Sequence, residues 1–348
     1  MGRGKDAEVA AAKALSTVDN MAAASLSSLS RAQKRAVSRR SRLPDPVRFA
    51  LVVVLSFSLS SLVHALLGTD GGQLATIARM SSSKYEIGML AAWRIFELAL
   101  GWFGDYDGYD LASLALLSHG PTAYLLSVFY GISPLTTGVY LGVEVVSCFL
   151  PFLLLRQLSG AHSAAPGVPN REIVVDRGIQ VLTSLLSALI YNVVLFLACR
   201  TFLPTILVLN FEGIPTIEPA TDAMLLGFGS PTTQVLSLLF GIAARTLIFT
   251  PLVTTPEAVQ DKQSTEFDPV KATLGQTVAW NLWGYTNQTK VSILRTTAAT
   301  IITAVGTYLQ CTLAINGVDS PGAATYAAVW AVATMATGLG LEQVGGGI

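Results

Sequence analysis

GIQVLTSLLSALIYNVVLFLA, residues 178–198, contains no charged side chain along 21 consecutive positions. A helix needs roughly 20 mainly apolar residues to cross about 30 Å of hydrocarbon. Similar runs recur from residue 47 almost to the C-terminus, and 51% of the 348 residues are hydrophobic whereas 13% are charged. Soluble domains carry about 25% charged residues. The sequence therefore predicts an all-α, polytopic integral membrane helix bundle.

The bundle is predicted to occupy residues 47–341, between a tail at 1–46 and a short C-terminal end at 342–348. The apolar run that begins at 178–198 continues beyond Pro204, which indicates a break and leaves an interfacial or re-entrant piece. Three later spans follow Ser-Pro pairs, which suits Ser at the N-cap and Pro in the first turn. We expect about eight spans, within a range of seven to nine, at residues 47–67, 87–103, 111–131, 134–155, 178–198, 231–253, 291–313 and 321–341.

The N-terminal tail is basic, rich in Ala, Ser and Arg, and is predicted to be largely disordered. Residues 1–48 hold ten Lys/Arg and four Asp/Glu, a net charge of +6 in a chain whose net charge is 0. Basic residues beside a first span favour the cytoplasmic side, and each attracts anionic lipid by about 1 kcal/mol. We expect the tail to bind anionic lipids or a soluble partner, not nucleic acid.

An even number of spans places the C-terminus on the cytoplasmic side with the tail. The organelle stays open: an endomembrane is favoured over the mitochondrial inner membrane. The predicted inner loop 254–290 turns amphipathic near its end and contains Trp280 and Trp283, which indicates a helix lying in the membrane interface. The same loop contains a glycosylation sequon, Asn287-Gln288-Thr289, on the predicted inner side.

Two charged residues, Arg94 and Glu97, interrupt the second predicted span. Their spacing places both on one face of a helix, and a charge near the bilayer centre costs about 2.5–3.5 kcal/mol on insertion scales. This face must therefore meet protein or water. We predict a polar network with ionisable residues of other spans, which is either a path for a solute or proton or a self-compensating structural network. The candidate partners are Glu144, Arg245, His64 and His119, together with Arg295 at the mouth of the seventh span.

The acidic run GDYDGYD, residues 104–110, follows that span and is interpreted as a turn at the membrane surface. Asp105, Asp107 and Asp110 are weak candidates for a hard cation, but the run lacks the other ligands of a calcium loop. Three cysteines lie in or beside apolar segments without CxxC spacing, so they are interpreted as core residues. The sequence predicts no cofactor.

The chain contains no Walker loop, zinc motif, G-x-S-x-G elbow or paired catalytic carboxylates. Its three histidines are too few for the histidine-rich boxes of a di-iron membrane oxidase. The pattern favours a protein that is not an enzyme, although an intramembrane enzyme stays open. Two hypotheses remain: a transporter or channel-like protein for a small polar or ionic solute, and a non-catalytic membrane organiser. Small-residue faces on the last two spans suit close helix packing, within one chain or in a homo-oligomer.

Overall fold

The structure, a computed structural model, describes residues 44–67, 72–79, 84–163, 167–221, 231–256, 273–275, 277–278 and 285–346. The chain divides into two compact units, residues 1–50 and 51–348. The described part of the first unit is the start of helix α2 (Asp45–Leu67), where Arg48 pairs with Asp45 at 2.5 Å. The predicted basic tail lies almost entirely outside the described residues, and so does most of the predicted interfacial helix.

The described residues form helices and no strand, with two isolated β-bridges joining Ala78 to Ile315 and Phe211 to Val318. The all-α membrane bundle predicted from the sequence is confirmed, and the chain is an integral membrane protein. Seven helices within the described ranges are long and apolar enough to cross a bilayer: α2, α5 (Gly108–Val128), α6 (Pro134–Leu155), α8 (Arg177–Arg200), the continuous segment α11–η1–α12 (Pro231–Thr254), α15 (Asn287–Ala314) and α16 (Ser320–Gly345).

Helix α4 (Lys84–Phe103) has 20 residues and packs against α5 and α15. It lies in the second range predicted to span the membrane, but its hydropathy separates it from the seven helices above. The cause is its charged side chains, Lys84, Glu86, Arg94 and Glu97. Because two of these charges are buried, α4 depends on its neighbours more than an ordinary apolar span does.

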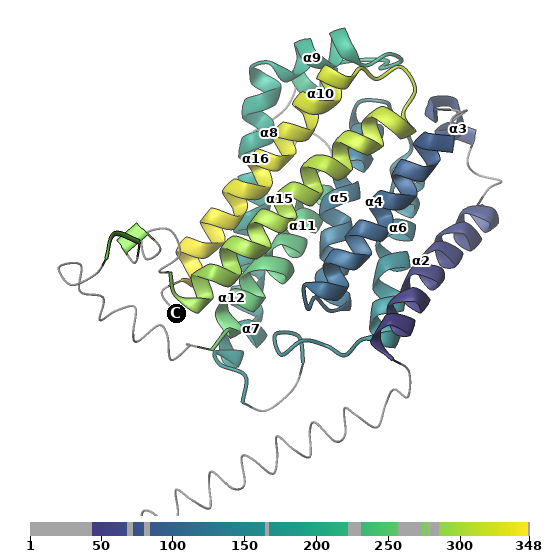
Figure 1. Ribbon diagram of the computed structural model, residues 1–348. Helices are drawn as coiled ribbons and strands as arrows, with labels where there is room; N and C mark the ends of the chain where they lie inside the picture. Colours follow the sequence, from purple (N-terminus) through teal and green to yellow (C-terminus); the bar gives the residue numbers. More distant parts are fainter. Residues whose placement is uncertain are drawn as a thin grey trace, which may run out of the picture. The chain divides into compact units, whose positions relative to one another are not determined.

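The helices of the second unit reverse direction at two ends (Figure 1). At the α7 end, which contains α7 (Arg171–Val175), the Asn170 side chain donates to the Val253 carbonyl at 3.2 Å. At the α9 end lie α3 (Gly72–Ile77), α9 (Leu203–Asn210) and α10 (Glu218–Thr221). There the Glu212 amide donates to the Gly317 carbonyl at 2.8 Å. These bonds tie loops that are distant in sequence.

Proline marks several helix starts, as the sequence predicted. Helix α8 ends at Arg200 and α9 begins at Leu203 with Pro204 in its first turn, so the predicted break is confirmed. Helices α6, α11 (Pro231–Ala244) and α16 also have Pro in the first turn. The expected serine caps are wrong in detail: the Ser133 side chain makes no capping hydrogen bond, and Asp319 holds the N-cap position of α16.

Trp330 of α16 lies at the centre of an aromatic core. The Phe240 ring of α11 lies 4.8 Å from it between centroids, and Tyr124, Tyr191 and Tyr326 surround it at 5.3 to 6.3 Å. Aromatic pairs at such distances contribute about 0.5–1.5 kcal/mol beyond area burial. This core joins α5, α8, α11 and α16.

A buried charge cluster and a second polar group at the α7 end

Four ionisable residues from three helices meet inside the bundle: Arg94 and Glu97 of α4, His119 of α5 and Glu144 of α6. We call them the buried charge cluster. Arg94 Nη1 lies 3.2 Å from Glu144 Oε2 and 4.0 Å from Glu97 Oε2. The exposed fractions of Arg94, Glu97 and His119 are 9%, 3% and 8%. The structure thus brings together four of the residues that the sequence proposed for a polar network.

Neighbouring polar groups orient these charges. Glu97 Oε1 accepts hydrogen bonds from Ser118 Oγ at 2.6 Å and from Trp93 Nε1 at 3.1 Å. Arg94 Nη2 donates to the Ser147 hydroxyl and to the backbone carbonyl of Glu144. Because donors from α4 and α5 hold Glu97, and acceptors from α6 hold Arg94, the rotamers of both side chains are fixed by three helices.

His119 differs from the rest of the cluster because its ring has no hydrogen-bond partner. Nε2 lies 3.9 Å from Glu97 Oε2 and 3.9 Å from Glu144 Oε2, beyond hydrogen-bond distance. Nδ1 and Nε2 are both buried and unpartnered. The imidazole therefore lies between two carboxylates, where a shift of under 1 Å toward either would complete a hydrogen bond.

The cluster lies near the middle of its helices. Arg94 is the eleventh of the 20 residues of α4, His119 the twelfth of 21 in α5, and Glu144 the eleventh of 22 in α6. Helices of this length cross the whole hydrocarbon layer. The cluster therefore lies away from both ends of α4, α5 and α6.

The cluster's formal charges do not balance. Two carboxylates, Glu97 and Glu144, meet one guanidinium, that of Arg94, which leaves one negative charge when His119 is neutral. An uncompensated buried charge costs several kcal/mol. One proton on His119 or on a carboxylate, or one bound cation, would remove that charge. The cluster is thus suited to binding and releasing a single positive charge.

A line of polar side chains on α15 leads away from the cluster. Gln310 Nε2 donates to the Ser118 carbonyl at 3.4 Å. Buried hydroxyls in helices ordinarily donate to a carbonyl one turn earlier. Five side-chain oxygens along this face are buried without a hydrogen-bond partner; they belong to Thr296, Thr300, Thr303, Thr307 and Gln310.

Gly306 allows α15 to approach the cluster closely. A Cβ at this position would collide with the Ser118 hydroxyl, the group that donates to Glu97, and would contact Trp93 Nε1 at 3.4 Å. Glycine is the residue that permits such an approach of backbones. The small-residue face predicted for this span is therefore buried inside the chain at Gly306, whereas Ala324 and Ala328 of the last span are exposed.

A second polar group lies at the α7 end, in the acidic run that the sequence presented as a plain turn. Asp107 is the N-cap of α5 and forms a capping box with Asp110. Asp107 Oδ2 also accepts from the Ser159 amide at 2.9 Å and lies 2.8 Å from His162 Nδ1. Burial opposes the ionised form, but His162, the Asp110 amide and Ser159 outweigh it and hold the pKa of Asp107 well below its usual value.

Arg295 of α15 connects this group to a helix irregularity. Both oxygens of Asp110 accept from Arg295, at 2.6 and 3.2 Å, and Nη1 also donates to the Leu247 carbonyl at 2.9 Å. Pro251 follows Leu247 by four residues and lacks the N–H that would bond this carbonyl in a regular helix. Leu247 lies in the π-helical segment η1 (Arg245–Phe249). Arg295 thus supplies a donor that proline removes.

The three predicted aspartates therefore separate. Asp105, at φ +57°, is exposed and pairs with Arg156 at 2.6 Å. Asp107 and Asp110 join His162, and one ligand atom of each lies within 4.8 Å of the others. A cation there would have to displace bonds that these carboxylates already make to protein donors. The sequence signal that could have revealed this group is the Asp-x-x-Asp spacing of a capping box. The partners of the two aspartates, His162 and Arg295, are distant in sequence.

The other proposed network residues are not placed in the cluster, and one of them, Arg295, binds Asp110 instead. Arg245 lies in η1, lines a separate pocket at the α7 end and makes its hydrogen bond to Thr246 at 3.4 Å. The side chain of His64 is outside the described part of the structure, so its prediction stays untested. Sequence reasoning found the cluster from the cost of buried charge but could not rank Arg245 against the other arginines.

The described residues establish a helical membrane protein with ionisable side chains at mid-helix depth. No family model, curated protein or solved structure matches the chain. Its task is therefore inferred from the chemistry and geometry of these side chains.

Proposed function

We propose that this protein is a transporter or channel-like protein for a small polar or ionic solute, and that the buried charge cluster binds the transported or coupling ion. The observation that carries the proposal is the unbalanced negative charge at the midpoints of α4, α5 and α6. Intramembrane ionisable residues are costly and characteristically mark pathways. A proton or cation that binds there would meet oriented ligands at the midplane.

A purely structural network is the competing explanation, and it accounts for less. A structural network is stable when each charge has a partner and each polar group a hydrogen bond. Here His119 has two unpartnered ring nitrogens between Glu97 and Glu144. That arrangement would allow a proton to move between His119 and either glutamate, which a purely structural network does not need.

The polar face of α15 supports a path between the cluster and the α7 end. Its unpartnered oxygens run from Gln310, whose side chain bonds the Ser118 carbonyl, to Thr296, which packs against Gly338 of α16. Arg295 in turn binds Asp110 near the first turn of α5. Water along this face would connect the cluster to one surface of the membrane.

The test is transport by the full chain in sealed vesicles. We would record currents on a solid-supported membrane while applying protons, sodium and a panel of amino acids, carboxylates, sugars and inorganic anions. Glu97→Gln and Glu144→Gln should each abolish the current, because each removes a charge that defines the site. Glu172→Gln changes an exposed glutamate at α7 and should leave it unchanged.

Thermal unfolding in detergent separates transport from structure. Loss of current with the unfolding temperature preserved supports transport. If the variants lose stability and the parent protein carries no current, the transport proposal is refuted. The organiser hypothesis depends on the basic tail, so removal of residues 1–43 distinguishes the two: a transporter should keep its current, whereas an organiser loses its partner or lipid binding.

A further inference from the structure

A pocket of about 360 Å³ lies at the α7 end, apart from the buried charge cluster. It is formed by the loop after α6, by α7 and by one face of η1 and α12 (Thr250–Thr254). Arg245 lines it, and Thr254 at the end of α12 lines it as well. Nine residues separate these two, which corresponds to about 13 Å along a helix. The pocket therefore extends from the helix end to a charge inside the span.

Arg245 is one of two arginines that line this pocket, and it forms no ion pair among the described residues. Its hydrogen bond, to Thr246, is long at 3.4 Å, and its Nε is buried without a partner. An arginine inside a span ordinarily pairs with a carboxylate or a carbonyl. An oxyanion in the pocket would compensate the charge of Arg245.

His162 adds a second unsatisfied group to the same pocket. Nδ1 lies against Asp107, which fixes the ring, and Tyr109 packs on it with centroids 5.5 Å apart. Nε2, on the other side of the ring, is buried and has no hydrogen-bond partner. Arg245 and His162 thus line one pocket from different elements, and the unpartnered His162 Nε2 is covered by protein.

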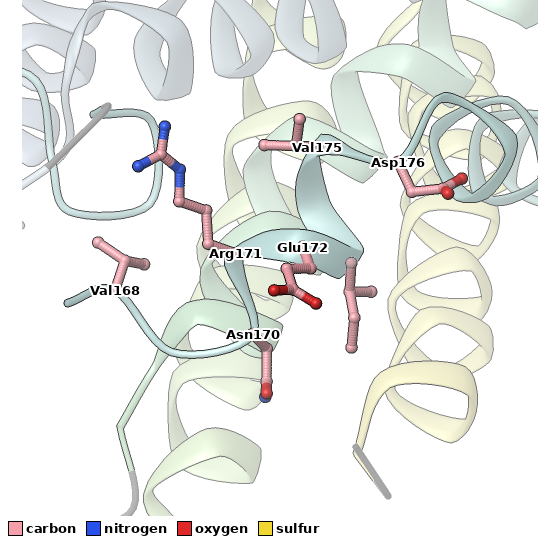
Figure 2. A pocket seen from close by; sticks show the side chains of 7 residues that line it. Val168, Asn170, Arg171, Glu172, Val175 and Asp176 are labelled. Carbon is pink, nitrogen blue, oxygen red and sulfur yellow. The ribbon is translucent and has the colours of Figure 1, made fainter. Parts of the chain in front are cut away.

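Arg171 of α7 increases the positive charge at the mouth of the pocket. It also lines an adjoining pocket of about 750 Å³ with Glu172 and Asp176. Figure 2 shows its guanidinium extending away from both of those carboxylates. Arg171 thus lines both pockets.

The local backbone also distinguishes this site. Arg245 begins the π-helical turn, and π-helical turns occur frequently at functional sites. The Thr250 hydroxyl donates to the Arg245 carbonyl, and the Thr254 hydroxyl donates to the Thr250 carbonyl. The lone pairs of the two hydroxyl oxygens are therefore the groups left to accept a hydrogen bond from a ligand. A ligand with acceptor oxygens for Arg245 and one acidic hydroxyl for a threonine oxygen would match the lining.

We propose that this pocket binds a phosphate group, and that Arg245 is its principal ligand. Guanidinium binds phosphate through charge-assisted hydrogen bonds. Free inorganic phosphate and the phosphomonoester headgroup of a lipid present the same chemistry. The proposal does not rest on the transport function, because it concerns binding at a separate site.

The first experiment measures binding of inorganic phosphate to the full chain in detergent by titration calorimetry. Arg245→Gln should weaken phosphate binding by roughly tenfold or more, as expected for loss of a hydrogen bond to a charged group. Arg177→Gln is the matched control, because Arg177 is exposed at the same end and does not line the pocket. Size-exclusion profiles verify folding. If Arg245→Gln does not fold, Arg245→Lys, which keeps the charge, is measured in its place.

The second experiment identifies the source of the phosphate. The unfolding temperature is compared in phosphatidylcholine vesicles with and without phosphatidic acid. A rise that requires Arg245 identifies a lipid headgroup, whereas an Arg245-dependent response to soluble phosphate alone identifies a free ligand. The proposal is overturned if neither probe binds the parent protein, or if Arg245→Gln and Arg177→Gln alter binding equally.

Discussion

Arg295 holds Asp110 through both carboxylate oxygens, at 2.6 and 3.2 Å, although 185 residues separate them in the sequence. Asp110 is fully buried. Since bidentate arginine–carboxylate pairs are among the strongest charge-assisted contacts, this pair fixes the start of α5 against α15. It also shows that the acidic run after α4 has a structural task beyond turning the chain.

Breaking this pair should be costly. Arg295→Gln leaves a buried carboxylate without its cation, so we expect a loss of roughly 3–5 kcal/mol in the free energy of unfolding. Asp110→Asn should cost a similar amount, and the double variant less than the sum of the two. Unfolding in mixed micelles measures each value, with Arg177→Gln as the control. Additive losses would show that the two residues do not act as a pair.

Gly306 should not tolerate a methyl group. Gly306→Ala places a Cβ against the Ser118 hydroxyl and forces α15 from the cluster, with an expected loss of about 1–3 kcal/mol. Gly142→Ala in α6 is the matched control, because no atom lies within 4 Å of its added Cβ. The same unfolding assay applies. Equal stability of the two variants would contradict the close approach described here.

Asp107 should make stability dependent on acid. The pKa of Asp107 in the folded protein lies below its usual value, whereas the pKa of an aspartate in the unfolded chain is about 3.9. The ionised form therefore stabilises the fold above about pH 4, and this contribution is lost as the pH falls through the folded pKa. Asp107→Asn should lower stability at pH 7, and its difference from the parent should shrink below about pH 4.

Asp105→Asn controls this measurement, because Asp105 is exposed and its pair with Arg156 is of the surface type, which contributes little. Asparagine also tolerates the positive φ of this position. Urea or thermal unfolding followed by circular dichroism across the pH range reads out both variants. If the stability of Asp107→Asn varied with pH in parallel with that of the parent protein, the stabilising role assigned to ionised Asp107 would be wrong.

The predicted orientation can be checked with single cysteines. The native cysteines Cys148, Cys199 and Cys311 are buried, so they should react slowly with a membrane-impermeant maleimide. Arg177→Cys and Lys84→Cys lie at helix starts that the eight-span topology assigns to opposite sides. In sealed vesicles of one orientation, one of the two cysteines should react at once and the other only after the membrane is permeabilised. Labelling from the same side would remove one span from the predicted count.

The sequence indicated the buried charge cluster for a physical reason. Charge inside a span is expensive, so Arg94 and Glu97 required partners, and only a few ionisable residues in other spans were available. Glu144 and His119 were among them, and the structure places both beside that pair. The helical architecture was likewise predictable, because length and hydropathy alone set the requirement for crossing a bilayer.

The contacts of the α7 end were not predictable in the same way. Asp107 and Asp110 sit in a stretch whose local chemistry is that of a turn, and their partners His162 and Arg295 come from a later loop and a much later helix. Arg245 was grouped with the cluster because it lies in a span, but its position along η1 directs it to another pocket. Pairing across helices depends on packing, which single-sequence patterns do not encode.

The bond from Arg295 to the Leu247 carbonyl also bears on movement. One guanidinium grips the first turn of α5 and, at the same time, the carbonyl that Pro251 leaves free. If the α11–η1–α12 segment tilted relative to α5, it would have to release one of these two grips before the other. The hydrogen bonds of a single arginine, Arg295, would then control when the two helices separate.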